Sequence, residues 1–168
     1  KINYYLDMAD AATERGTCLR RRFGAIIVKN DEIVSTGYAG APRGRENCCD
    51  LGKCIRQEMG VKRGERYELC RSVHAEANAI ISAARRDMIG ATLYLVGHEV
   101  DSGDYVENAA PCSMCKRLII NAGIKGVLNF TSAPLNFPQG IFVENYDITT
   151  ILEKVAYFVK ASEENENN

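Results

Sequence analysis

Strand-like and helix-like segments alternate along this chain, and that alternation limits the folds that are open to it. Two β-rich runs, at 24–29 and 32–38, are joined by Asn30 and Asp31, which predicts a hairpin. Alternating helices and strands after a hairpin are typical of helices that cover a central sheet, so the pattern predicts a three-layer α/β fold. The other expected elements are helices at 2–15, 73–86 (capped by Ser72), 111–121 and 147–160, and strands at 91–96 and 126–131.

Length and composition predict one folded domain. The chain has 168 residues, of which 46% are hydrophobic, and it contains no internal repeat. We expect a single domain over 1–161 and a disordered, acidic, amide-rich tail at 162–168. The stretch 40–71 carries four cysteines but little periodicity. A segment of that length is too long for a simple connecting loop, so we expect an additional feature to order it.

The charge balance excludes one class of function. The 21 basic and 22 acidic residues give a net charge of −1, which argues against a protein built mainly to bind nucleic acid. No apolar run reaches the length of about 18 residues that a membrane span needs, and we expect no secretory leader. We therefore expect a cytoplasmic protein with neither nucleic acid nor membrane as a partner.

The number of cysteines is high for such a protein. In an intracellular chain, seven cysteines favour metal ligands or reactive thiols over disulfides. They are Cys18, Cys48, Cys49, Cys54, Cys70, Cys112 and Cys115.

Two short motifs each begin a predicted helix: HAE at 74–76 and PCSMC at 111–115. Cys112 and Cys115 are three positions apart, so on a helix their side chains lie about 60° apart and reach one metal ion. The positive end of the helix dipole favours the thiolate form of both. With His74 as a third ligand, a Zn²⁺ ion keeps its fourth position open, which is typical of a catalytic site.

Glu76 is the expected catalytic carboxylate. It lies about 200° around an ideal helix from His74, so it is poorly placed to bind the same metal and well placed to move protons beside it. Either motif alone has an ordinary explanation, as a redox cysteine pair or as the start of an amphipathic helix. Together they form the H-x-E…P-C-x-x-C signature of zinc-dependent nucleobase deaminases.

Two longer runs, CRSVHAEANAI at 70–80 and GYAGAPRG at 37–44, resemble the deoxycytidylate (dCMP) deaminase family of bacteria and phages, and the similarity covers 1–131. The resemblance implies a cytidine-deaminase-like α/β/α sandwich with a central mixed five-stranded sheet. It also implies hydrolysis of dCMP to dUMP and ammonia for thymidylate synthesis, with zinc activating the water that attacks C4 of cytosine. Members are homo-oligomers, usually hexamers, so we expect a hexamer or a dimer with dCTP and dTTP as effectors.

The same resemblance implies a set of substrate contacts. The N–H of Ala75 and the carbonyl of Ala110 are expected at the reacting edge of the base, and Asn78 is expected among the substrate-binding residues. Arg85 matches the phage arginine that contacts the 5′-phosphate, although a solvated charge at a helix end is the ordinary alternative. Ala39 stands where the family usually has asparagine, which puts the sugar contact or the nucleotide regulation in doubt.

A second, structural zinc is also implied. In phage members, cysteines that match Cys18 and Cys48 bind zinc together with two histidines. The corresponding stretch has no histidine here, and Cys54 and Cys70 are available instead. We expect a closed Cys₄ site that makes 40–71 a zinc-binding insertion, with Cys49 as the spare thiol or as an alternative to Cys48. Buried cysteines without a metal are the alternative.

Two rival functions remain open. One is a deaminase of another cytosine nucleotide or nucleoside, and an enzyme that acts on free nucleosides needs no clamp for a 5′-phosphate. The other is a non-catalytic zinc-binding accessory protein. Glu76 favours an enzyme, because a structural metal site does not need a carboxylate beside an open metal position.

Overall fold

The computed structural model describes residues 2–62, 64–107, 109–129 and 137–145. They form a mixed five-stranded sheet with the order β2-β1-β3-β4-β5. β1 is antiparallel to β2 and β3, whereas β3, β4 and β5 run parallel. The strands are β1 (Arg21–Lys29), β2 (Glu32–Tyr38), β3 (Thr92–Glu99), β4 (Gly126–Asn129) and β5 (Phe142–Asn145).

The expected hairpin of β1 and β2 is confirmed. Asn30 and Asp31 both have positive φ, at 52° and 71°, which suits a two-residue turn between twisted strands. The hydroxyl of Tyr5 donates to the Asp31 carboxylate at 2.6 Å and thereby ties the turn to the N-terminal helix. This hydrogen bond is the largest cause that raises the pKa of Tyr5 to about 12.

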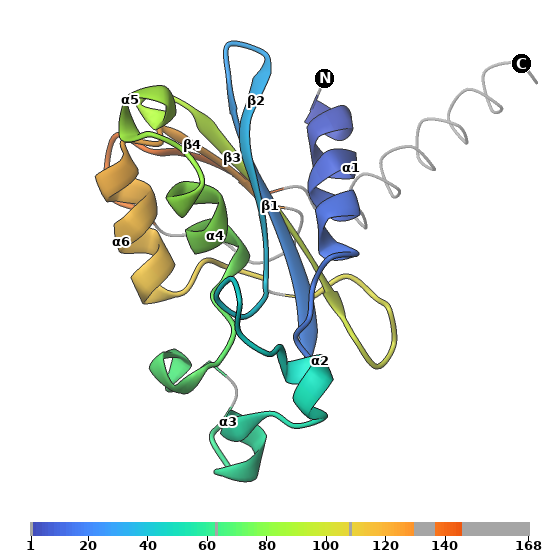
Figure 1. The fold of residues 1–168 in the computed structure, drawn as a ribbon. Coiled ribbons are helices and arrows are strands. Elements are labelled where there is room, and N and C mark those ends of the chain that lie inside the picture. The colour runs from blue at the N-terminus through green and yellow to red at the C-terminus, as the bar shows by residue number, and fades with distance from the viewer. Residues whose placement is uncertain (1, 63, 108, 130–136, 146–168) are drawn as a thin grey trace, which may run out of the picture.

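Helices cover both faces of the sheet, which confirms the three-layer architecture (Figure 1). On one face, α1 (Ile2–Thr13) packs Leu6 and Ala9 against β1 and β3. On the other face, a second core forms beneath α4 (Ala75–Ile81), α5 (Arg85–Met88) and α6 (Ser113–Ala122). In the described part of the chain, no helix is long and apolar enough to cross a membrane.

Gly37 lets α4 lie directly on the sheet. A Cβ atom at this position would collide with the carbonyl oxygen of Ala75 and with the backbone nitrogen of Ala79. The Oγ of Ser35 also donates to the Ala79 carbonyl at 2.8 Å. The start of α4, where His74 is the N-cap residue, is therefore positioned by β2.

The prediction of a single helix at 73–86 is wrong. His74, not Ser72, is the N-cap residue, and α4 ends at Ile81 before α5 begins at Arg85. The Oγ of Ser82 donates to the carbonyl of Asn78 at 2.8 Å. Such local side-chain bonds offer the backbone an alternative to continued helix, and Ala84 is extended with ψ of 141°.

The Cys-rich segment lies beyond the end of the sheet (Figure 1). It contains α2 (Cys48–Leu51), α3 (Ile55–Glu58) and the 3₁₀ turn η1 (Tyr67–Leu69). The N–H of Cys49 donates to the carbonyl of Thr17 at 3.2 Å, which joins α2 to the turn before β1.

Two expected helices have other ends in the structure: the first ends at Thr13, and the one expected from 111 begins at Ser113. The remaining differences lie at the C-terminal end. β5 is a strand that the residue pattern did not predict. The last residues of the strand expected at 126–131, the helix expected at 147–160 and the tail at 162–168 lie outside the described residues.

Candidate active site

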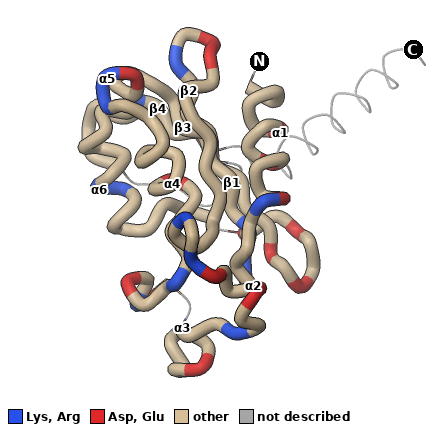
Figure 2. The backbone as a smooth tube through the Cα atoms, viewed as in Figure 1, with Lys and Arg blue, Asp and Glu red and all other residues tan. Residues whose placement is uncertain are grey.

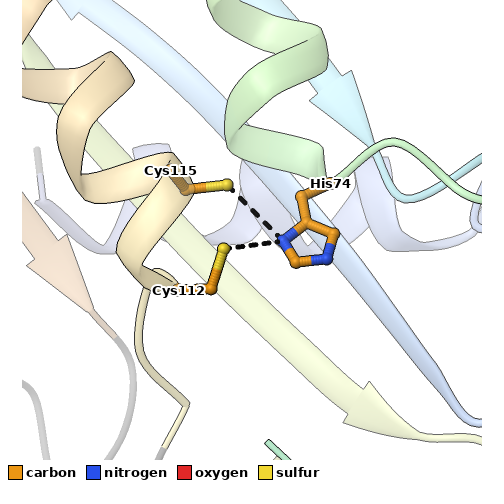
Figure 3. Close-up of side chains that lie close together, drawn as sticks. All are labelled: His74, Cys112 and Cys115. Carbon is orange, nitrogen blue, oxygen red and sulfur yellow. Dashed lines mark hydrogen bonds between the residues drawn. The ribbon is translucent and has the colours of Figure 1, made fainter. Parts of the chain in front are cut away.

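Two helix starts bring three ligand atoms together. His74 precedes α4, Cys112 is the N-cap residue of α6, and Cys115 lies in the first turn of α6. The Nδ1 atom of His74 is 3.4 Å from the Sγ of Cys112 and 3.5 Å from the Sγ of Cys115 (Figure 3). Among the described residues, these three form the only group of histidine, cysteine or acidic side chains with ligand atoms all within 4.8 Å of one another.

The distances fit a zinc ion. Zn–S bonds of about 2.3 Å and Zn–N bonds of about 2.0–2.1 Å in a tetrahedral site place sulfur and nitrogen about 3.6 Å apart. The two observed nitrogen–sulfur separations, 3.4 and 3.5 Å, are close to that value. Two thiolates and one imidazole are also ligands that zinc prefers, so the residues can hold this metal with a fourth position to spare.

The three side chains strongly affect one another's protonation. Hydrogen bonds with Cys115 and His74 lower the pKa of Cys112 to about 3, although burial opposes the shift. The bond with Cys112, together with burial, raises the pKa of Cys115. Burial by itself lowers the pKa of His74, but hydrogen bonds with Cys112 and Cys70 outweigh it and raise the pKa to about 10. A metal that binds here must displace the shared protons.

Glu76 is buried beside this cluster. Its exposed fraction is 4%, and burial raises the pKa of its carboxyl while the charge of His74 opposes the rise. A buried carboxyl with a raised pKa takes up and releases protons near neutral pH more readily than an exposed one.

A pocket of about 780 Å³ opens over the cluster. This volume lies within the range typical of small-molecule sites. Its walls include His74, Glu76 and Cys112 from the cluster and Ala75 and Ala110, the two expected contacts to the base. The structure thus brings both expected contacts to the same pocket as the candidate ligands.

Asn78 and Arg85 lie elsewhere among the described residues. The Nδ2 of Asn78 donates to the carbonyl of Tyr38 at 2.8 Å and so helps to fix α4 to the end of β2. The Nε of Arg85 donates to the carbonyl of Asn121 at 2.9 Å at an exposed position. Neither residue lines the pocket of this chain.

The four cysteines expected at a second zinc are neighbours. Cys18, Cys54 and Cys70 line the pocket. Cys48 is buried with its Sγ 3.6 Å from the Oγ of Ser72, whereas Cys49 is exposed. The four thiols do not meet the 4.8 Å limit that His74 and its two partners meet, so the second zinc stays a prediction.

Residue patterns did not single out Tyr67, which contacts His74 from the Cys-rich segment, or Arg56, which contacts Tyr67. Tyr67 packs against His74, with ring centroids 4.9 Å apart. The Cζ atom of Arg56 lies over the ring of Tyr67, 4.4 Å from the ring centroid. The segment has little periodicity, so no sequence signal places these side chains near residue 74.

Comparisons with known proteins agree with this geometry. A deoxycytidylate deaminase of Mycobacterium phage D29 is 37% identical over 130 residues, which cover 74% of this chain and 90% of that protein. A deoxycytidylate deaminase of Schizosaccharomyces pombe is 34% identical over 132 residues, which cover 77% of this chain. The chain spans only 37% of the length of that yeast relative.

A solved structure supports the fold. The crystal structure of dCMP deaminase from the cyanophage S-TIM5 in its apo form matches with a TM-score of 0.57 at 24% identity, over 86% of this chain and 95% of that chain. The expected cytidine-deaminase-like fold is therefore confirmed. The family model described as "Cytidine and deoxycytidylate deaminase zinc-binding region" matches residues 1–131. Since that match covers most of the sequence, the chain belongs to the zinc-binding cytidine and deoxycytidylate deaminase family.

Proposed function

We propose that this protein hydrolyses dCMP to dUMP and ammonia and thereby supplies dUMP for thymidylate synthesis. One observation carries the proposal: the buried carboxylate of Glu76 lies beside the cluster of His74, Cys112 and Cys115 at a pocket of about 780 Å³. A purely structural metal site needs neither the carboxylate nor the pocket. The relatives named deoxycytidylate deaminase support dCMP as the substrate.

The proposed mechanism divides the work between the metal and Glu76. Zinc held by the three ligands supplies Lewis acidity, which lets a water molecule lose a proton near neutral pH. The Glu76 carboxylate takes that proton as the water attacks C4 of cytosine and delivers it to N3. It then takes the proton of the C4 hydroxyl that the attack has formed and passes it to the amino group, which leaves as ammonia while the C4 carbonyl of uracil forms. Burial of Glu76 keeps bulk water from competing for these protons.

Backbone groups orient the base in this proposal. Ala75 is the first residue of α4, and the first N–H groups of a helix have no partner within the helix. Its N–H and the carbonyl of Ala110 both belong to residues that line the pocket. A donor and an acceptor at these positions suit the polar edge of a pyrimidine. We retain Asn78 as a substrate-site residue that acts through its bond to the Tyr38 carbonyl, which fixes α4.

For the 5′-phosphate we retain Arg85 as the proposed ligand. Its known bond, from Nε to the Asn121 carbonyl, uses one of the five N–H donors of a guanidinium. The other donors suit a phosphate, and the side chain is exposed. Because Arg85 does not line the pocket of its own chain, the proposal requires the pocket to be extended toward α5 when substrate binds.

We also propose a structural zinc held by Cys18, Cys48, Cys54 and Cys70. Burial is the largest cause that raises the pKa of Cys18 and Cys48, and the charges of Cys70 and Cys54 raise both further. A divalent cation that binds Cys18 and Cys48 as thiolates would offset this cost of ionising them. Such a site would join the Cys-rich segment 40–71 to the turn before β1 and would leave Cys49 exposed and spare.

The wider assignments are proposals on the same basis. We propose one domain over 1–161 that acts in the cytoplasm as a homo-oligomer, either a hexamer or a dimer, with dCTP and dTTP as effectors. Ala39 lines the pocket in place of the asparagine that is usual in the family. Of these assignments, the response to dCTP and dTTP is therefore the one that this substitution affects most directly. Basic and acidic residues are both spread over the described elements (Figure 2), which supports a protein without a nucleic-acid partner.

One assay tests the function. The zinc-loaded protein is incubated with cytidine, deoxycytidine, CMP, dCMP or dCTP, and the ammonia released is measured. The proposal expects the highest kcat/KM for dCMP. Equal rates with deoxycytidine and dCMP would instead identify a nucleoside deaminase, and no release from any of the five compounds would favour a non-catalytic zinc protein.

A further inference from the structure

We propose that Tyr67, clamped by Arg56, is a positioning residue for the imidazole of His74. Through this pair the Cys-rich segment would set the geometry of the catalytic metal site. The inference rests on the proposed role of His74 as a metal ligand. It goes beyond that role because neither Arg56 nor Tyr67 belongs to the deaminase motifs.

The first step is the contact between the two rings. The rings of Tyr67 and His74 meet edge to face, at an interplanar angle of 88° and a centroid distance of 4.9 Å. This is a favourable arrangement for aromatic rings, and it restricts rotation of the smaller one. The Nδ1 of His74 is the atom that approaches both thiols, so a turned imidazole would carry its ligand atom away from them.

The second step is the clamp on Tyr67. Arg56 is only 5% exposed, which is unusual for an arginine, and its Cζ lies 4.4 Å from the Tyr67 ring centroid. Its Nη2 donates to the carbonyls of Lys62 at 3.2 Å and Glu65 at 2.5 Å. A cation held over an aromatic face in a dry setting contributes more than an exposed one. Arg56 therefore fixes the turn that carries Tyr67 as well as the ring itself.

The Nε of Arg56 is buried without a hydrogen-bond partner among the described residues, so the guanidinium is held by its Nη2 bonds and its stacking. Metal-binding histidines are commonly oriented by neighbours of this kind, whose loss typically lowers metal affinity about 10- to 100-fold.

A competing role exists for Arg56, because both it and Tyr67 line the pocket. A cation in a pocket wall can bind the substrate directly. The two roles differ in what they change: a substrate contact alters KM for dCMP, whereas a positioning residue alters metal affinity and kcat. The experiment must therefore measure the metal itself.

The test compares Tyr67→Leu, which removes the ring, with Tyr67→Phe, which keeps it. Zinc affinity is measured by competition with a chelator, and the Co²⁺-loaded proteins are compared by visible absorption. The band of this site is the one that is absent from a Cys112→Ser control. We expect Tyr67→Leu to weaken the metal about tenfold, to shift the Co²⁺ band and to lower kcat with little change in KM, and we expect Tyr67→Phe to restore all three.

Unchanged affinity and an unchanged band in Tyr67→Leu would overturn the proposal, as would equal losses in Tyr67→Phe and Tyr67→Leu. If circular dichroism shows that Tyr67→Leu is unfolded, Arg56→Gln decides. Weaker metal binding in Arg56→Gln supports the positioning role, whereas a raised KM with normal metal affinity makes Arg56 a substrate contact and overturns it. Failure of the wild-type protein to bind metal would instead refute the zinc site proposed above.

Discussion

The Nδ1 of His74 lies 3.4 Å from the Sγ of Cys112, although 38 positions separate the two residues along the chain. They meet because α4 and α6 pack on the same face of the sheet with their N-terminal ends close together (Figure 1). Three ligand atoms and the Glu76 carboxylate thus come from the starts of only two helices. The following predictions test what this arrangement does.

Replacing one thiol ligand should remove both the metal and the activity. We expect Cys115→Ser to lose one zinc per chain and more than about 100-fold in kcat/KM, a larger effect than the loss of a residue that only orients a ligand. Zinc content by elemental analysis and ammonia release check this. Cys49→Ser is the matched control, because Cys49 is exposed and lies outside the pocket. A Cys115→Ser protein with normal zinc and normal rate would contradict the ligand assignment.

Removing the carboxylate of Glu76, the proposed proton carrier, should separate binding of the metal from turnover. We expect Glu76→Gln to retain zinc and to lose about 10²- to 10⁴-fold in kcat, since general acid–base catalysis is typically worth that much. The amide is similar in size to the carboxyl and fits the same buried space. Zinc content and kcat are measured on the same preparation. A normal rate in this variant would refute the mechanism.

The phosphate role of Arg85 is tested with paired substrates. We expect Arg85→Ala to lower kcat/KM for dCMP roughly 10- to 100-fold while it changes the value for deoxycytidine little, because only dCMP carries the charged group. Arg86→Ala is the control, since the side chain of Arg86 is exposed and pairs with Asp87. Equal losses with both substrates would mean that Arg85 serves the fold through its bond to the Asn121 carbonyl.

The proposed second zinc predicts a specific metal count. We expect two zinc ions per chain in the wild type and one in Cys54→Ser, with a lower melting temperature because the metal no longer joins the Cys-rich segment to the turn before β1. Cys49→Ser should keep both ions. One zinc in the wild type, with Cys18, Cys48, Cys54 and Cys70 all titratable in the folded protein, would refute the Cys₄ site.

Gly37 should be intolerant of even a methyl group. We expect Gly37→Ala to reduce the free energy of unfolding by about 1–3 kcal/mol, because the new Cβ would collide with the backbone of α4 at Ala75 and Ala79. Thr36→Ala, at the exposed neighbouring position, is the control. Denaturant unfolding monitored by circular dichroism measures both. A stability equal to that of the control would mean that α4 shifts at little cost.

Local sequence determined much of the secondary structure. Asn30 and Asp31 adopt the positive φ that a two-residue hairpin turn needs, and glycine ends α6 with Gly123 at a φ of 80°. The HAE and PCSMC motifs each stand at a helix start, as predicted. The sequence predicts helix starts well because capping and helix-stop signals act over only a few residues. Cys112 caps α6 and is not part of it, so the side-chain angle expected for two cysteines within one helix does not describe Cys112 and Cys115.

Tertiary structure decided what depends on contacts between distant segments. The break between α4 and α5 arises where the Ser82 side chain bonds back to the Asn78 carbonyl. Arg85 consequently starts a separate helix, and its Nε donates to the carbonyl of Asn121. β5 is identified by its pairing with β4, and its short sequence carries no pattern of its own. The stack of Arg56 and Tyr67 on His74 exists only because the Cys-rich segment folds back over the start of α4. Periodicity and spacing describe neighbours along the chain, whereas these contacts depend on how the packed elements lie in space.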